Sequence, residues 1–488
     1  MSVLVVDVGT SSVRASVVDG NAVAHVRRRE VLPSSPAPGF VEFDPLEMAA
    51  AVLEVARASA ADAAGSGVRV EGVGITNQRA STVVWDRRSG TPVGPGIGWQ
   101  DLRTVGTCLV LRDQGIRVAP NESVTKLAML LDLADPDRTR DLCFGTVDSW
   151  VAWTLSEGAL HVTDQTNAGV TGLLVADGTT WNGAILEALR IPERVLPEIV
   201  DSAGQVGAAT ALPGAPVICG IAGDQQASLV GQGCTRPGLA KATFGTGGML
   251  DACVGPTRPR FERRGGAGTF PIAAWRRSGR TTWGVEAVML SAGTCVEWLR
   301  DDLGIIEDAA DSEKVADACS DTGDVWFVPA LLGLGTPVWD FGARGTYLGI
   351  TRGTGRPEMV RAVIEGVAHR GADLLEAAEA DTGLEIAALR VDGGMSANGV
   401  FVQALADAVG RPVEISPVLE ATTLGAAYLA GMALGTYADE DEVAEAWHPA
   451  RTVEPKVSDS RRRSLRQRWL DARDRSLRTV PELSNLEF

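Results

Sequence analysis

The stretch VLVVDVGTSSVRASVVD, residues 3–19, sets the pattern that decides the fold. The mostly apolar run VLVVDV predicts a buried strand, GTSS (9–12) predicts a tight turn, and VRASVVD predicts a returning strand. The segment LAKATFGTGGML (239–250) repeats this strand and its Gly-Thr turn. The two matching turns form a weak internal repeat, which indicates two related halves that face each other.

Strand and helix patterns alternate through the rest of the chain, which predicts an α/β protein. The predicted elements are a helix over 45–65 that Gly65 ends, a buried strand over 68–76, a strand, turn and helix over 215–233, a strand running into a helix from 389, a helix of small residues over 421–435 and an Arg-rich surface helix over 457–478. The Gly-rich stretch 231–238 predicts a boundary between two domains, residues 1–232 and 233–488.

The charge balance and the cysteines exclude several classes of protein. The 488 residues contain 45 Lys and Arg against 62 Asp and Glu, a net charge of −17 that argues against a general nucleic-acid binder. The start of the chain has no signal-peptide pattern, and no apolar run approaches the ~18 residues of a membrane span. Seven scattered cysteines and four histidines show no metal-ligand spacing. We therefore expect a cytoplasmic protein with no membrane insertion.

The Gly-rich turns that follow predicted strands are candidate phosphate sites. Glycine lets the backbone approach a phosphate, and the amides and the Thr or Ser hydroxyls donate hydrogen bonds to it. A third such turn, DGGMSANG (392–399), could hold a base or a ribose. The chain has neither the GxxxxGK[ST] pattern of a P-loop nor a GxGxxG pattern that opens a helix after a strand.

Two aspartates follow apolar strands, and each has a structural and a functional interpretation. Asp7 could cap a turn, or it could organise Mg²⁺ through water beside phosphates. Asp224 could be a helix N-cap, or it could be a general base that takes a proton from a substrate hydroxyl. Position alone favours the structural interpretation of both residues.

Many separated segments resemble one family in its own order, from residue 5 to about residue 470. The matching segments are VVDVGTSSVRA (5–15), PGFVEFDPLE (38–47), GITNQR (74–79), TVVWDRRSGTPV (82–93), WQD (99–101), FGTVDSWVAWTL (144–155), HVTDQTNAG (161–169), GIAGDQQASLVGQGC (220–234), FGTGGML (244–250), VPALLGLGTPVWD (328–340), ARGTYLGITRG (343–353), VDGGMSANG (391–399) and LEATTLGAAYLAGMALG (419–435). Together they resemble the FGGY family of carbohydrate kinases and, within it, the glycerol kinase branch.

The resemblance implies two actin-like (ribonuclease H-like) domains with ATP and a sugar in the cleft between them. It implies Asp224 as the catalytic base, and Arg79, Trp99 and Gln225 as further substrate-binding residues. The residues that it implies for ATP are Thr10, Ser11, Arg14, Gly245, Thr246, Gly293, Gly394 and Asn398, with Mg²⁺ held by Asp7 through water.

Four positions depart from the glycerol kinase pattern. Ala80 stands where those kinases have Glu, Asn121 where they have Tyr, and Met249 where they have an aromatic residue, so a wider substrate pocket with fewer anchors is expected. Glu297 stands where they have Gln near the nucleotide, which puts one ATP contact in doubt.

The resulting hypothesis is an ATP- and Mg²⁺-dependent kinase that phosphorylates a terminal hydroxyl of a small polyol or sugar. The alternative within the class is a four- or five-carbon polyol or ketulose, of xylulose or erythritol type, in place of glycerol. The alternatives of another class are a non-catalytic actin-like ATPase and a regulatory pseudokinase. The expected partner is a small molecule and no nucleic acid, and the self-assemblies to consider are a homodimer and a homotetramer.

Overall fold

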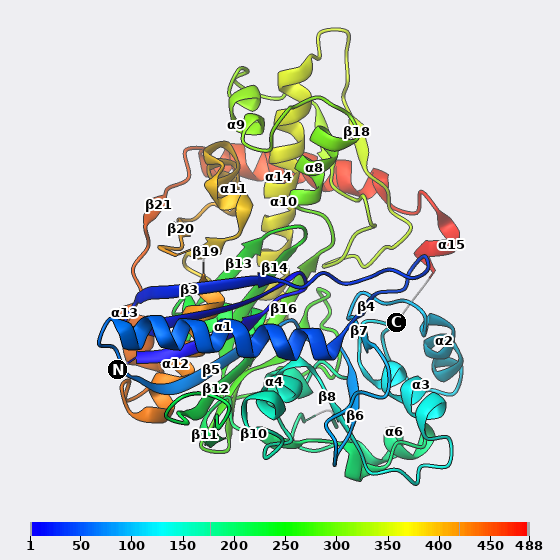
Figure 1. Ribbon diagram of the computed structural model, residues 1–488. Helices are drawn as coiled ribbons and strands as arrows, with labels where there is room; N and C mark the ends of the chain where they lie inside the picture. The colour runs from blue at the N-terminus through cyan, green and yellow to red at the C-terminus, as the bar shows by residue number, and fades with distance from the viewer. Residues whose placement is uncertain (1, 176, 419, 486–488) are drawn as a thin grey trace.

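A thirteen-stranded sheet runs through the computed structural model, which describes residues 2–175, 177–418 and 420–485 (Figure 1). Its strand order is β21-β20-β19-β13-β14-β16-β15-β11-β12-β5-β1-β2-β3. The strands are β1 (Ser2–Val8), β2 (Ser12–Asp19), β3 (Ala22–Glu30), β5 (Val70–Asn77), β11 (Ala203–Ala208), β12 (Val217–Gly223), β13 (Ala240–Phe244), β14 (Gly248–Gly255), β15 (Phe270–Arg277), β16 (Arg280–Met289), β19 (Leu389–Asp392), β20 (Val413–Ile415) and β21 (Arg451–Val453).

The same five-strand arrangement occurs twice in this sheet. In the N-terminal half-sheet, β3-β2-β1 is an antiparallel meander, and β5 and β12 continue it parallel to β1. In the C-terminal half-sheet, β16-β14-β13 is the antiparallel part, and β19 and β20 continue it parallel to β13. Strand β11 joins the halves, since it is antiparallel to β12 and pairs once with β15. The repeated topology confirms the α/β fold class with two actin-like units.

Short strand pairs and helices complete the fold. The smaller strands are β4 (Glu42–Phe43), β6 (Val83–Asp86), β7 (Gly96–Ile97), β8 (Leu142–Gly145), β9 (Val162–Asp164), β10 (Glu198–Val200), β17 (Trp326–Val328) and β18 (Thr346–Leu348). The helices are α1 (Pro45–Gly65), α2 (Val105–Asp113), α3 (Val124–Ala134), α4 (Val147–Leu155), α5 (Gln165–Ala168), α6 (Gly183–Ala188), α7 (Asp224–Gly231), α8 (Gly293–Asp301), α9 (Asp311–Ala316), α10 (Arg356–Thr382), α11 (Gly399–Val409), α12 (Ala421–Leu434), α13 (Glu440–Ala446), α14 (Asp459–Ser476) and α15 (Pro481–Ser484).

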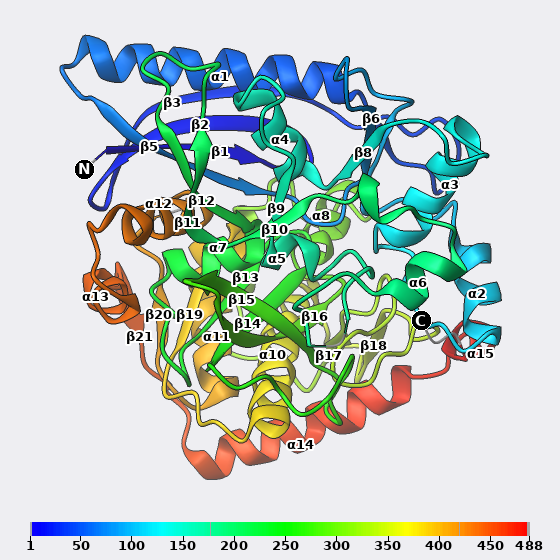
Figure 2. The same cartoon turned by 90° about the horizontal axis from the view of Figure 1, so that it is seen from below.

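The predicted long helices form for the expected local reasons. Helix α1 covers the predicted range 45–65, and the Asp44 carboxylate caps it by accepting from the amides of Leu46 and Glu47. The small-residue helix α12 ends at Gly435, which adopts the left-handed conformation with φ 80°. The predicted surface helix is α14, and it lies on the opposite side of the molecule from α1 (Figure 2).

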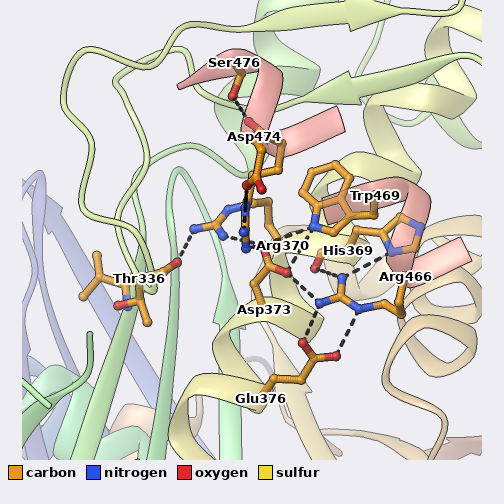
Figure 3. A network of polar contacts seen from close by, with 11 residues as sticks. Thr336, His369, Arg370, Asp373, Glu376, Arg466, Trp469, Asp474 and Ser476 are labelled. Carbon is orange, nitrogen blue, oxygen red and sulfur yellow. Dashed lines mark hydrogen bonds and ion pairs between the residues drawn. The ribbon is translucent and has the colours of Figure 1, made fainter. Parts of the chain in front are cut away.

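A buried network of charges holds α14 against α10 (Figure 3). Asp373 of α10 accepts hydrogen bonds from Arg370 at 2.6 Å and from Arg466 at 2.6 Å, and the indole of Trp469 donates to it at 3.1 Å. The ring of His369 stacks on Trp469 at 5.3 Å. Because Asp373 is the shared acceptor of two buried guanidinium groups, it anchors the C-terminal helix to the core.

Helices α7 and α12 cross where the two halves meet. Helix α7 follows β12 of the N-terminal half-sheet and contacts β13 and β14 of the other half. Helix α12 follows β20 of the C-terminal half-sheet and packs across β1, β5 and β12. The crossing is close, because a Cβ atom at Gly425 would overlap the carbonyl oxygen of Ala227, and one at Gly231 would overlap that of Ala421.

Substitution of Gly425 tests this contact. Gly425→Ala is expected to lower the free energy of unfolding by about 1–3 kcal/mol or more, because the added methyl group forces two helix backbones apart. The matched control is Gly106→Ala in α2, where a Cβ atom meets nothing within 4 Å and better helix propensity predicts no loss. Urea unfolding measures both variants, and equal effects would contradict the close-crossing argument.

Candidate functional site

The candidate site lies at the carboxyl ends of three parallel strands. Strands β1, β5 and β12 are in register there, with Val8 opposite Asn77 and Asn77 opposite Gly223. Asp7 lies near the end of β1, Arg79 follows β5 and Asp224 follows β12. Carboxyl ends of parallel strands share one edge, which is where α/β proteins of this kind bind ligands. Residues far apart in the sequence therefore meet at one place.

Arg79 lies at the centre of the site and reaches both halves of the molecule. Its Nη2 donates to Oε2 of Glu286 on β16 at 2.7 Å, and its Nε lies 3.5 Å from Oδ1 of Asp224. Its side chain is 11% exposed. Nη1 is buried and has no hydrogen-bond partner among the described residues. A buried guanidinium N–H without an acceptor is costly, so an oxygen placed beside this atom would supply the partner that it lacks.

Asp224 is the first residue of α7, and Gly223 is the N-cap. The N-cap interpretation of Asp224 is therefore wrong. Its carboxylate remains 34% exposed toward solvent. Burial of the carboxyl raises the pKa of Asp224 above its ordinary value, and the positive charge of Arg79 opposes that shift. A carboxylate with a raised pKa and an open face has the properties of a general base.

A buried lysine holds the residue beside Asp224. Lys241 of β13 donates through Nζ to Oε1 of Gln225 at 2.7 Å and to Oγ1 of Thr243 at 3.1 Å. The same Nζ lies 2.7 Å from the Asp251 carboxylate, and both side chains of this ion pair are fully buried. Gln225, an implied substrate residue, is thus oriented by the C-terminal half-sheet.

Four residues that the resemblance assigns to the substrate pocket have different surroundings. Met249 places its sulfur 3.9 Å from Nη2 of Arg79. Trp99 donates through Nε1 to the Thr10 hydroxyl at 3.4 Å, which links the expected substrate pocket to the first phosphate turn. Ala80 is buried in a left-handed conformation with φ 62°, and Asn121 is exposed at the surface.

The first phosphate turn contacts the start of α12. The amide of Gly9 donates to the carbonyl of Ser12 at 3.0 Å, which closes the turn that carries Thr10 and the exposed Ser11. Arg14 forms an ion pair with Glu420, and the Thr422 hydroxyl donates to the Asp7 carboxylate at 3.2 Å. Burial raises the pKa of Asp7 to about 6, against the opposing charge of Arg14.

The second phosphate turn and the start of α8 come together in the C-terminal half. The amide of Gly293 donates to the carbonyl of Gly245 at 2.8 Å, and the amide of Ala292 donates to that of Thr246 at 3.0 Å. Glu297 lies exposed one turn further along α8.

The third Gly-rich turn supplies the other implied nucleotide residues. Gly394 is exposed, and Asn398 caps α11 by accepting from the amide of Phe401 at 3.0 Å. Its Nδ2 donates to the Ser312 hydroxyl at 3.2 Å. The turn adjoins the second phosphate turn, because Gly393 packs against the backbone of Phe244.

Sequence reasoning missed three charged residues of this region. Glu286 pairs with Arg79, Lys241 orients Gln225, and Lys126 binds backbone carbonyls at Trp99 and Asn121. A signal existed for the lysines, since the chain contains only four of them, and both Lys126 and Lys241 lie in segments that flank expected site residues. Nothing in the local sequence marks Glu286.

The described residues offer neither a membrane span nor a metal cluster. No described helix is long and apolar enough to cross a membrane. Within residues 2–175, 177–418 and 420–485, no group of three or more His, Cys, Asp or Glu side chains is arranged to hold a metal ion by itself.

Comparison with known proteins agrees with the fold along the whole chain. Residues 2–231 match the model of the N-terminal domain of the FGGY family of carbohydrate kinases, and residues 240–434 match that of its C-terminal domain. Among curated proteins, glycerol kinase of Rhodospirillum centenum is 41% identical, with 98% of this chain and 99% of the relative covered. Glycerol kinase 2 of Thermotoga maritima is also 41% identical, with coverage of 97% and 98%.

Solved structures show the same likeness. The Plasmodium falciparum glycerol kinase with ADP has a TM-score of 0.90 at 27% identity, with 98% of each chain covered. The xylulose kinase of Lactobacillus acidophilus has a TM-score of 0.84 at 20% identity, with 97% of each chain covered, which shows likeness of fold alone. With both family models and full-length relatives in agreement, the chain belongs to the FGGY family of carbohydrate kinases.

Proposed function

We propose that this kinase transfers the γ-phosphoryl group of ATP to a terminal hydroxyl of a small polyol bound against Arg79 and Asp224. The observation that carries this assignment is the unpaired buried Nη1 of Arg79 beside an open carboxylate of raised pKa. A hydroxyl placed there could accept a hydrogen bond from Arg79 and give its proton to Asp224. The glycerol kinases similar to this chain support a polyol as the acceptor class.

The two Gly-Thr turns are proposed to hold the ATP phosphates from opposite sides. Amides and hydroxyls at Thr10, Ser11, Gly245 and Thr246 would donate to phosphate oxygens, and Arg14 would add a positive charge. Gly293, Gly394, Asn398 and Glu297 would lie toward the nucleoside. Because the donors belong to both halves of the molecule, a bound nucleotide would bring those halves together.

The site also fits Mg²⁺ held mainly by phosphates and water. Asp7 offers a carboxylate at the first phosphate turn, and Asp224 is close enough to raise the pKa of Asp7. Mg²⁺ in phosphoryl-transfer enzymes is commonly held by one or two carboxylates together with substrate phosphates. When bound, the ion would neutralise charge on the transferred group, and Asp7 is the residue that we propose for it.

Acceptor choice is proposed to differ from that of a kinase with Glu and Tyr in the pocket wall. Ala80 and Met249 carry no hydroxyl-binding group, and the Asn121 side chain is exposed at the surface. Sites that bind substrate hydroxyls discriminate strongly, because the wrong ligand leaves their polar groups unpaired. With fewer such groups, the pocket favours a four- or five-carbon polyol or ketose over glycerol.

The expected cytoplasmic location and the assembly state stay predictions.

Removal of the proposed base tests the mechanism. Asp224→Asn keeps the size of the side chain and removes the proton acceptor, so kcat is expected to fall by about 10²–10⁴-fold. Isothermal titration is expected to show ATP binding within a few-fold of wild type. Asp474→Asn on the exposed side of α14 is the control for a lost carboxylate. Near-normal turnover by Asp224→Asn would refute the assignment.

The charges around Asp224 predict opposite shifts of the acid limb in the pH profile of kcat/KM. The base must be ionised, so activity falls as pH drops through its pKa. Arg79 lowers the pKa of Asp224 and Glu286 raises it. Arg79→Gln is therefore expected to move the limb to higher pH by about one unit or more, and Glu286→Gln to lower pH. Met249→Leu, which changes no charge, is the control. Shifts in the same direction would show that another group titrates.

A panel of C3 to C5 polyols and ketoses tests the acceptor proposal. Wild type is expected to have its highest kcat/KM with a four- or five-carbon compound. Ala80→Glu is expected to shift preference toward glycerol, because the added carboxylate can accept from its hydroxyls. Ala80→Gln, with the same length and no charge, separates that effect from steric filling. If wild type prefers glycerol to every longer compound, the pocket argument fails.

A further inference from the structure

We propose that Ser123 and Lys126 are positioning residues that hold one wall of the acceptor site by its backbone and thereby set the acceptor selectivity of the kinase. The inference rests on the proposed function, because it takes Ala80, Trp99 and Asn121 as the wall. These two residues belong to the segment PNESVTK (120–126), at and just inside the start of α3.

Lys126 joins two separate segments of the wall. Its Nζ donates to the carbonyl oxygens of Gly98 at 2.9 Å, of Trp99 at 3.2 Å and of Asn121 at 3.4 Å. The side chain is fully buried. Hydrogen bonds from a charged donor in a buried setting are stronger than neutral ones, so this ammonium group strongly restrains the backbone at Trp99 and Asn121.

Ser123 holds the third segment. Its hydroxyl donates to the carbonyl oxygen of Ala80 at 2.8 Å, and the Thr82 hydroxyl donates to the same oxygen at 3.2 Å. Ala80 has φ 62°, a left-handed conformation that costs a residue other than glycine about 1–2 kcal/mol. Such a conformation persists only where the surroundings hold it, and the Ser123 hydroxyl is one of those restraints.

A second serine connects the segment of Ala80 to the segment of Trp99. The Ser81 hydroxyl accepts from the amide of Trp99 at 3.1 Å and donates to the side-chain oxygen of Gln78 at 3.0 Å. The backbone at Ala80, Trp99 and Asn121 is therefore held through groups that do not depend on the side chains at those three positions. The wall can change its side chains without changing its frame.

Burial and several neighbouring charged groups shift the pKa of Lys126. Burial lowers the pKa of Lys126 to about 8, with Arg103 acting in the same direction and Asp101, Cys108 and Glu122 acting against it. Above that pH the neutral amine has fewer hydrogens for its three carbonyl acceptors. The restraint on the wall should therefore weaken as pH rises through about 8.

Lys126→Met removes the donor and keeps the length of the side chain. The matched control is Thr125→Val, which removes the hydrogen bond from Thr125 to the Thr104 hydroxyl at 2.8 Å, in the same buried turn of α3 but away from the wall. Lys126→Met is expected to raise the KM for the best acceptor about tenfold or more, to change the ratio of kcat/KM between C3 and C5 acceptors, and to leave the KM for ATP within about twofold.

The pH profile gives a readout that a purely structural role would not move. Wild type and Thr125→Val are expected to show a rise in acceptor KM above a pH of about 8, and Lys126→Met is expected to lack it. If Lys126→Met does not fold, Ser123→Ala is expected to change the acceptor selectivity in the same direction by a smaller amount. Ser123→Thr, which keeps a hydroxyl, is expected to retain the wild-type selectivity. Equal effects of Lys126→Met and Thr125→Val on acceptor KM and selectivity would overturn the proposal.

Hydrogen exchange separates this proposal from the proposed function. Backbone amides at 79–82, 97–101 and 119–122 are expected to lose protection in Lys126→Met and to keep it in Thr125→Val, with no acceptor present. If wild type phosphorylates no compound of the panel while these amides respond as expected, the proposed function fails and the restraint stands. If wild type is active and the amides keep their protection in Lys126→Met, the restraint is refuted.

Discussion

The close crossing of α7 and α12 is the contact on which the candidate site depends. Gly231 and Gly425 let the two helix backbones meet without intervening side chains, so each helix packs against the half-sheet from which it does not start. The first residues of both helices lie at the site: Asp224 begins α7, and Glu420 and Thr422 at the start of α12 contact Arg14 and Asp7. The crossing therefore fixes the proposed base and the first phosphate turn relative to each other.

The charges of the candidate site are balanced across the two halves of the molecule. Arg79 is a buried cation whose neighbours are Glu286, Asp224 and Asp251, so its charge is matched from both halves of the molecule. A buried charge is tolerated only when it is paired. The pairing leaves Nη1 of Arg79 free among the described residues and leaves Asp224 open to solvent. Burial raises the pKa of Asp224, and the charge of Glu286 adds to that rise, so the carboxylate that pairs with Arg79 also has the raised pKa of the base that we propose.

Local sequence predicted the elements well and the long-range partners poorly. The strand run at 3–8, the helix at 45–65 and the small-residue helix at 421–435 were predicted because periodicity, capping residues and glycines act over a few residues. The fold class was confirmed, and Asp224 was placed at a strand end as expected. The N-cap alternative failed because Gly223 occupies that position.

Glu286 was missed because it is 207 residues from Arg79, and no spacing rule spans that distance. Lys126 and Lys241 were missed because their partners, backbone carbonyls at Gly98 and Trp99 and the side chain of Gln225, come together only in the folded chain.

The proposed acceptor wall separates a backbone frame from the side chains that it carries. Its frame is made of backbone carbonyls and amides held by Lys126, Ser123 and Ser81, all of which are fully buried. The side chains at positions 80, 99 and 121 are the ones that we propose to face the acceptor. The hydroxyls of Ser123 and Thr82 hold the carbonyl oxygen of Ala80, so any other residue at that position would need the same left-handed backbone. On this proposal, selectivity can change one side chain at a time, while the placement of the acceptor relative to Asp224 depends on the backbone frame.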